Sequence, residues 1–122
     1  MITMNDNAYN YVNLDYLDMM SDGDDEMKKV MLDMLFEELP EEVSKMRSLL
    51  QSRDIKELGA VSHKMKSTLA FVGNPEMTDA NKQIEELAKS DSESDQFSGL
   101  IHILEELIPK AIAELKREYA RI

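Results

Sequence analysis

The chain has 122 residues and a formal net charge of −11, with 43% hydrophobic and 32% charged residues and no cysteine. These values predict one soluble globular domain over residues 1–122 and exclude a disordered chain, a disulfide framework and thiolate chemistry. The negative charge argues against binding to nucleic acid or an anionic membrane, and no segment approaches the roughly 20 apolar residues of a membrane span. We therefore expect a cytoplasmic protein.

The first part of the chain predicts a lead-in and one short helix. Residues 1–12 are polar, lack a basic or apolar targeting run, and are interpreted as a flexible lead-in. Asn13 is a suitable cap for a helix from Leu14 to Met20, which the turn at residues 21–24 ends. We expect Tyr16, Leu17 and Met20 to fold over one end of a larger helical bundle.

A long helix is predicted from about Asp24 to Gln51, because three acidic residues favour its N-terminus and apolar residues recur every three or four positions. Pro40 lies inside it, so we expect a kink or a local break. The expected apolar stripe consists of Met27, Met31, Met34 or Leu35, Leu39, Val43, Met46 and Leu50. Flexible core filling is the favoured role for the methionines.

Three further helices follow. Asp54 can cap a helix from Ile55 to about Val72, which Gly73 ends, and Pro75 suits the first turn of a helix reaching about Lys89. The last helix is predicted at about 95–121, with a bend at Pro109. Four long helices with short loops predict an all-α, up-down-up-down four-helix bundle with a short extra N-terminal helix.

The helix at 55–72 has two different faces. Its core-facing stripe is Ile55, Leu58, Val61, Met65, Thr68, Leu69 and Val72. His63 lies off this stripe, so its imidazole is expected to point outward. Its neighbours at one helical turn are Gly59, Ala60, Lys66 and Ser67, with Ala70 beyond them. Small neighbours leave the ring accessible to another protein.

Neutral imidazole is a nucleophile near pH 7, and a phosphoryl group on His63 would carry negative charge that Lys66 could offset. The segment 53–73 has four basic and two acidic residues, a net charge of +2 in an otherwise acidic chain. A solvated surface histidine among ordinary surface lysines also explains this pattern, and both interpretations stay open. His102, which lies near Glu105 and Glu106, is interpreted as an ordinary surface histidine.

The run from His63 to Gly73, HKMKSTLAFVG, resembles the signature of histidine-containing phosphotransfer (HPt) domains. His63, Met65, Lys66 and Gly73 match that signature, whereas Ser67 replaces the usual glycine. A serine adds only a hydroxymethyl group, so access to the ring should survive. The likeness extends roughly from residue 14 to residue 90.

The resemblance implies a phosphocarrier of a two-component phosphorelay. His63 would accept a phosphoryl group from an aspartyl phosphate on a receiver domain, through Nε2, and pass it to another receiver. Family members often orient the histidine with a glutamine or glutamate 22 residues later, which is Glu85 here. A plain solvated role for Glu85 stays open.

The implied partners are response-regulator receiver domains and a hybrid sensor kinase. We expect the chain to be a monomer. Docking is expected at apolar residues near the short first helix and at the small and basic positions around the histidine, namely Lys56, Gly59, Ala60, Lys64, Ser67 and Ala70. No cofactor or metal is expected in this chain, since Mg²⁺ would be supplied at the receiver, and no glycine-rich loop suggests direct use of ATP.

Two other classes stay open. One is a helical adaptor or scaffold in which the histidine is incidental. The other is a small hydrolase or metal enzyme, although two histidines on different helices make a histidine-rich metal site hard to build.

Overall fold

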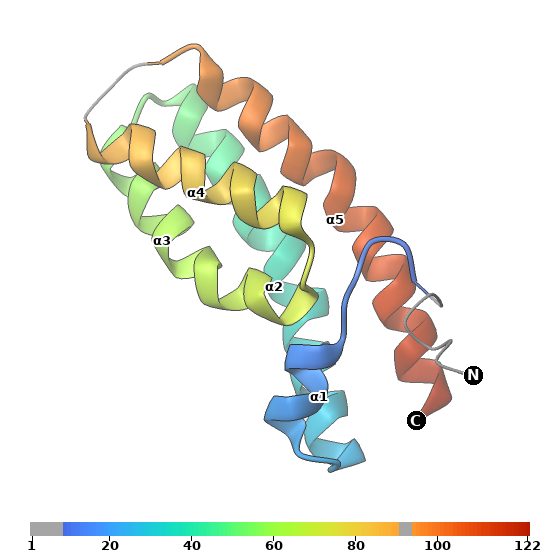
Figure 1. The fold of residues 1–122 in the computed structure, drawn as a ribbon. Helices are drawn as coiled ribbons and strands as arrows, with labels where there is room; N and C mark the ends of the chain where they lie inside the picture. Colours follow the sequence, from blue (N-terminus) through green and yellow to red (C-terminus); the bar gives the residue numbers. More distant parts are fainter. Residues whose placement is uncertain (1–8, 91–93) are drawn as a thin grey trace.

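The computed structural model describes residues 9–90 and 94–122, and this part of the chain contains helices and no strand (Figure 1). The helices are α1 (Asp15–Ser21), α2 (Asp25–Gln51), α3 (Ile55–Val72), α4 (Pro75–Lys89) and α5 (Gln96–Arg121). Packing of α2 and α4 against both α3 and α5 closes a four-helix bundle, and α1 packs on α2 and α3 at one end. The predicted all-α bundle with an extra N-terminal helix is confirmed. None of the described helices is long and apolar enough to cross a membrane.

Helices α2, α3 and α4 begin where the capping residues predict, whereas α1 begins at Asp15, one residue later than expected. The side chain of Asp24 accepts hydrogen bonds from the amides of Glu26 and Met27, and that of Asp54 accepts one from Glu57. Asn74 caps α4 in the same way, directly before Pro75. By contrast, α2 runs through Pro40 without a break. Packing on both neighbouring helices outweighs the one backbone hydrogen bond that a proline removes.

The core confirms the stripe predicted for α3, because all seven of its residues are buried. The stripe predicted for α2 is wrong at Met27, which is exposed, whereas Lys28 and Leu32 face inward. Met31 and Met34 are half-buried against the core, and Leu35, the predicted alternative to Met34, is buried. Positions 28 and 32 have the same helical spacing as positions 27 and 31, so periodicity alone could not choose between them.

The expectation of a flexible lead-in is wrong for its last residues, and residues 1–8 lie outside the described residues. The buried carboxylate of Glu114 on α5 accepts hydrogen bonds from the backbone amides of Asn10, Tyr11 and Val12, at 2.8, 2.7 and 3.1 Å. Val12 is itself buried. We call residues 9–13 the N-terminal strap, since they join α5 to the end of α3.

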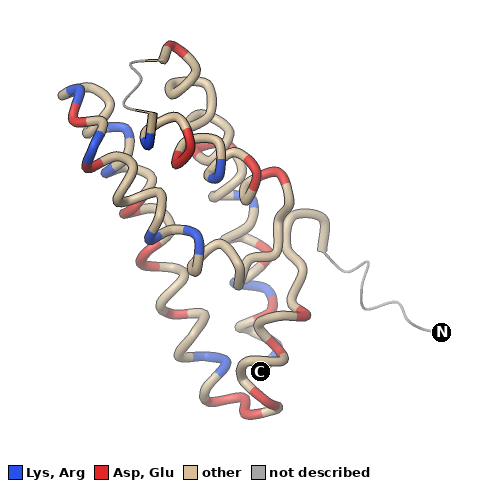
Figure 2. The backbone as a smooth tube through the Cα atoms, turned by 60° about the vertical axis from the view of Figure 1, so that its left-hand side comes forward, with Lys and Arg blue, Asp and Glu red and all other residues tan. Residues whose placement is uncertain are grey.

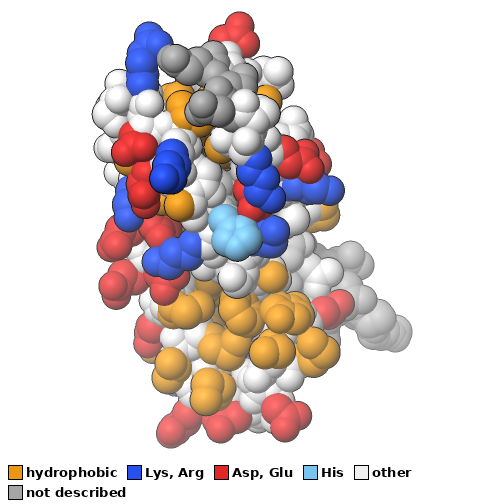
Figure 3. All heavy atoms as spheres, turned by 90° about the vertical axis from the view of Figure 1, so that its left-hand side faces the viewer, with side chains coloured by type: hydrophobic (Ala, Val, Ile, Leu, Met, Phe, Trp, Pro, Cys, Tyr) orange, Lys and Arg blue, Asp and Glu red, His pale blue; other side chains and the backbone are white. Residues whose placement is uncertain are grey.

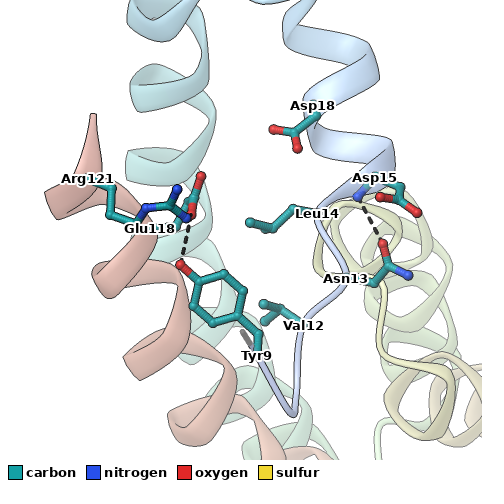
Figure 4. Close-up of a pocket in the computed structure, with 8 residues that line it drawn as sticks. All are labelled: Tyr9, Val12, Asn13, Leu14, Asp15, Asp18, Glu118 and Arg121. Atoms are coloured by element: carbon teal, nitrogen blue, oxygen red, sulfur yellow. Dashed lines mark hydrogen bonds and ion pairs between the residues drawn. The ribbon is translucent and has the colours of Figure 1, made fainter. Parts of the chain in front are cut away.

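A second carboxylate of α5, Glu118, lies one turn further on and joins three elements. It accepts a hydrogen bond from the Tyr9 hydroxyl at 2.8 Å (Figure 4). It accepts another from the Lys28 ammonium at 2.6 Å. Burial alone would raise the pKa of Glu118, but the hydrogen bonds from Lys28 and Tyr9 outweigh it and leave that pKa lowered. Glu118 is therefore ionised at neutral pH although it is buried.

We expect acid to weaken the fold. Hydrogen bonds from His63 to Glu85 and from Arg47 to Glu105 lower the pKa of those carboxyls too. The unfolded chain, whose glutamates titrate near pKa ~4.3, then binds protons before the folded chain does. The free energy of unfolding should stay level above about pH 6 and fall as the pH drops through ~4.3 toward the lowered values.

Urea unfolding at several pH values measures this dependence. The variant Glu118→Gln should have a shallower acid limb than the wild type, because it lacks one of the titrating groups. A wild-type stability that does not change between pH 7 and pH 3 would contradict the expectation.

Gly73 ends α3 in a left-handed conformation, with φ = 71°, and a Cβ there would lie 2.5 Å from the carbonyl oxygen of Asn13. We expect Gly73→Ala to destabilise the protein by about 2 kcal/mol or more, since it combines backbone strain with a clash against the strap. Gly99→Ala is the matched control. A Cβ at Gly99 meets open space within α5, so this variant should gain up to ~1 kcal/mol in helix propensity. Urea unfolding measures whether the free energy of unfolding falls in Gly73→Ala and rises in Gly99→Ala.

Candidate functional site

His63 stands on the outward face of α3, and its side chain is 70% exposed. On the face of the bundle that carries α3, an exposed imidazole has Lys or Arg side chains on both sides of it (Figure 3). The outward direction predicted from the helical stripe is therefore found in the structure.

Glu85 of α4 lies beneath this ring. Its Oε2 is 2.6 Å from His63 Nδ1, and its side chain is only 5% exposed. The hydrogen bond with His63, followed by that with Lys66, lowers the pKa of Glu85, so the carboxylate is ionised at neutral pH and can only accept. Nδ1 must then carry the ring proton when the imidazole is neutral, and the lone pair is on Nε2. Among the described residues, Nε2 has no hydrogen-bond partner.

Two lysines share the same carboxylate. Lys66 Nζ is 3.4 Å from Oε1 of Glu85, and Lys89 Nζ is 3.6 Å from Oε2. Both ammonium groups are exposed and face the solvent side of the site. The sequence analysis named Lys66 and Glu85 but missed Lys89. The spacing of four residues between Glu85 and Lys89 on one helix was the signal that could have found it.

A buried polar pair holds α3 and α4 together beside the imidazole. The hydroxyl of Ser62 donates to the side-chain and backbone oxygens of Asn81 at 2.8 Å, and the Asn81 amide donates to the Ser62 carbonyl at 2.9 Å. Ser62 precedes His63, and Asn81 lies one turn before Glu85 on α4. The pair therefore fixes the distance and register of the two helices where His63 and Glu85 meet.

A recess of about 510 Å³ opens beside the ring. It is lined by Lys56, Gly59, Ala60, His63, Glu85, Ala88 and Lys89. Gly59 was predicted as an exposed docking position, but it is half-buried, and a Cβ there would lie 2.8 Å from Cβ of Ala88. This glycine therefore permits the close approach of α3 and α4 as well as access to the ring.

The other predicted docking positions are all exposed. They are Lys56, Ala60, Lys64, Ser67 and Ala70. Lys64 points to α2, where its Nζ lies 3.3 Å from the buried carboxylate of Glu42, so it belongs to the opposite side of α3 from the recess. The Ser67 hydroxyl donates to the carbonyl of Lys64 at 3.4 Å within its own helix.

Hydrophobic side chains gather on the same face, next to the imidazole and over α1 and the start of α2 (Figure 3). We call this the apolar patch, and its exposed members are Tyr16, Met19, Met20, Met27 and Val30. The rings of Tyr16 and Phe71 are 5.2 Å apart, which joins the patch to α3. Of the three α1 residues predicted to fold over the bundle end, Leu17 is buried and Tyr16 packs on Phe71, whereas the prediction is wrong for Met20, which is exposed.

Charge is divided along this face. Lys and Arg positions recur along α3, whereas the turn between α1 and α2 is strongly acidic (Figure 2). His102 lies on α5 with an exposed side chain, 3.8 Å from Glu105, as expected of a surface histidine. In the part of the chain that the structure describes, no three His, Asp or Glu side chains converge as a metal site requires.

Comparison with known proteins agrees with the resemblance seen in the sequence. The family model described as Hpt domain matches residues 30–120, which reaches further toward the C-terminus than the expected likeness. The fold is similar to the crystal structure of histidine-containing phosphotransfer protein B (HptB) from Pseudomonas aeruginosa PAO1. The TM-score is 0.82 at 20% identity, over 92% of this chain and 96% of that one. No curated protein matches the sequence.

Proposed function

Since the chain belongs to the Hpt domain family and is thereby a histidine phosphotransfer carrier of phosphorelays, we propose that His63 is the residue that carries the phosphoryl group. The observation that carries this proposal is the pairing of His63 with Glu85. A buried carboxylate 2.6 Å from Nδ1 leaves the lone pair on the exposed Nε2. Hpt domain proteins are carriers and not kinases, so ATP alone should not label this chain.

The transfer step needs few groups from this chain. Nε2 of His63 attacks the phosphorus of an aspartyl phosphate on a receiver domain, the N–P bond forms, and the O–P bond breaks with its electron pair left on the aspartate. The ring becomes a cation, which the hydrogen bond from Nδ1 to the Glu85 carboxylate stabilises. Lys66 and Lys89 face the charge of the phosphoryl oxygens. Mg²⁺ and most of the transition-state stabilisation would come from the receiver.

Receiver docking would use two adjoining surfaces. The lysines at the recess suit the acidic, Mg²⁺-binding site of a receiver, and the apolar patch offers contact area next to the ring. A small interface is enough for a transient partner. Exposed methionines adapt to differently shaped surfaces, which suits a carrier that meets both a donor and an acceptor receiver.

The decisive experiment incubates the purified chain with receiver domains from the same source, each phosphorylated by acetyl phosphate with Mg²⁺. Radioactive label should move from one receiver to this chain and onward to a second receiver. The label should be lost in acid and kept in alkali, as an N–P bond requires. Absence of label with every receiver would contradict the proposed function.

Lys66→Ala is expected to slow transfer by about tenfold, equivalent to ~1.4 kcal/mol in the barrier, without lowering the melting temperature. The ammonium is 59% exposed, so the fold does not depend on it, whereas a phosphoryl group on His63 would lose a nearby positive charge. Lys116→Ala on α5 removes a lysine distant from the site and is the matched control. An unchanged transfer rate with a lowered melting temperature would contradict the assigned role.

A further inference from the structure

The apolar patch depends on a helix that cannot hold itself in place. α1 has seven residues, and isolated helices of that length are unstable in water. The only side chain that caps its start belongs to Asn13 of the strap, which accepts a hydrogen bond from the Asp15 amide at 2.9 Å. The only buried residues of α1 are Leu17 and Ser21. The residues that α1 contributes to the patch are all exposed, namely Tyr16, Met19 and Met20. Something outside α1 must therefore fix its position.

The N-terminal strap fixes the beginning of α1. Besides its three bonds to Glu114, the amide of Asn13 donates to the carbonyl of Val72 at 2.9 Å. The side chain of Asn74 donates to the carbonyl of Tyr11 at 2.9 Å. The strap is thus tied to α5 on one side and to the end of α3 on the other, directly before α1 begins.

Lys28 of α2 fixes the body of α1. Its Nζ lies 2.6 Å from Asp18 of α1 and 2.6 Å from Glu118 of α5, with only 10% of its side chain exposed. Burial alone would lower the pKa of Lys28, but the hydrogen bonds to Asp18 and Glu118 outweigh it and raise that pKa. Figure 4 shows Asp18 and Glu118 on opposite sides of the polar cavity that separates α1 from α5.

We propose that Lys28, Glu114 and Glu118 are positioning residues for receiver docking: by holding the strap and α1, they keep Met19 and Met20 beside the phosphoryl site. This inference rests on the proposed function. None of these residues lines the recess at His63, so they act on docking without direct contact with the ring. Carboxylates of the last helix thereby determine the shape of a surface made by the first helix.

The test uses Lys28→Met, which keeps the length of the side chain, with Lys29→Met as the matched control on the same helix. The receiver that transfers fastest to the wild type is the probe. Lys28→Met should raise the receiver concentration needed for half-maximal transfer by about tenfold with the maximal rate nearly kept. Labelling of His63 by phosphoramidate, which needs no docking, should stay within twofold. An unchanged concentration dependence in the folded variant would overturn the inference.

A second variant and a measurement without a receiver keep the inference testable if Lys28→Met unfolds or no receiver is found. Asp18→Asn alters an exposed partner of Lys28, cannot unfold the bundle core, and has Asp15→Asn as its control on α1. Hydrogen exchange of the α1 amides should be faster in Asp18→Asn and unchanged in Asp15→Asn. Equal exchange in all three proteins would overturn the inference without reference to any receiver.

A double-mutant cycle identifies α1 as the route. Met20→Ser alone should weaken docking, because it removes an exposed apolar contact. In the Asp18→Asn or Lys28→Met background, the same substitution should add little further loss, since α1 is already displaced. Independent, multiplicative losses would show that the ion pairs of Lys28 and the apolar patch act separately and would overturn the proposal.

Discussion

His63→Gln is expected to accept no phosphoryl group from any receiver domain, a loss of about a thousandfold or more, equivalent to ~4 kcal/mol in the barrier. Glutamine keeps polarity and approximate size, but its amide nitrogen has no free lone pair for attack on phosphorus. The measurement is transfer of radioactive label from a phosphorylated receiver. Circular dichroism should show an unchanged helical bundle, since the His63 side chain is 70% exposed.

His102→Gln is the matched control for this prediction. Both histidines are exposed, and each lies near a glutamate. Glu105 is half-exposed and 3.8 Å from His102, whereas Glu85 is buried and 2.6 Å from His63. The control should accept label at the wild-type rate. Equal labelling of His63→Gln would mean that the imidazole is incidental, which would favour an adaptor or scaffold.

The geometry around His63 was accessible from the sequence because local rules determine it. A residue off the apolar stripe of a helix must point outward, and Asp54 and Gly73 mark where that helix begins and ends. The contact with Glu85 was reached differently, through the spacing of 22 residues that the family resemblance supplied. The structure contains this contact, whereas its role in transfer stays a prediction.

The N-terminal strap and the buried charges that hold it could not be predicted in this way. Polar residues near a chain end resemble a solvated tail, and only their pairing with Glu114 and Glu118, about a hundred positions away, shows otherwise. Apolar periodicity places charged residues outside by default, so it could not predict that Lys28 and two glutamates are buried. Helical periodicity also assigned Met27 to the core, so the part of the apolar patch that α2 contributes was not predicted, whereas apolar docking residues near the short first helix were.

Glu85→Leu is expected to lower the transfer rate by about 100-fold, or ~2.7 kcal/mol in the barrier. Leucine cannot accept the hydrogen bond from Nδ1, so the neutral ring of His63 is free to carry its proton on either nitrogen. The cationic ring of the phosphorylated state also loses its nearest negative charge. Nitrogen-15 NMR of the imidazole should show a mixture of tautomers in this variant and the Nδ1–H form in the wild type.

Stability should change in the opposite direction to transfer. Glu85 is nearly buried between α3 and α4, but its partners His63, Lys66 and Lys89 are exposed, so removing the carboxylate leaves no buried charge unpaired. The buried apolar area that leucine adds should offset the lost ionic contacts. Glu85→Leu should therefore melt at the wild-type temperature or above it. A lower melting temperature with unchanged transfer would show that Glu85 serves the fold and not the imidazole.

Glu85→Gln separates the charge of this residue from its hydrogen bond. Glutamine keeps one oxygen that can accept from Nδ1, so the tautomer of His63 should be preserved and transfer should stay within about tenfold of the wild type. Any loss of rate in Glu85→Gln then measures the contribution of the negative charge, which also holds Lys66 and Lys89 beside the carboxylate. Glu86→Gln, on the neighbouring exposed position, is the control. If both glutamine variants matched the wild type, the hydrogen bond alone would account for the role of Glu85, and its negative charge would contribute nothing to transfer.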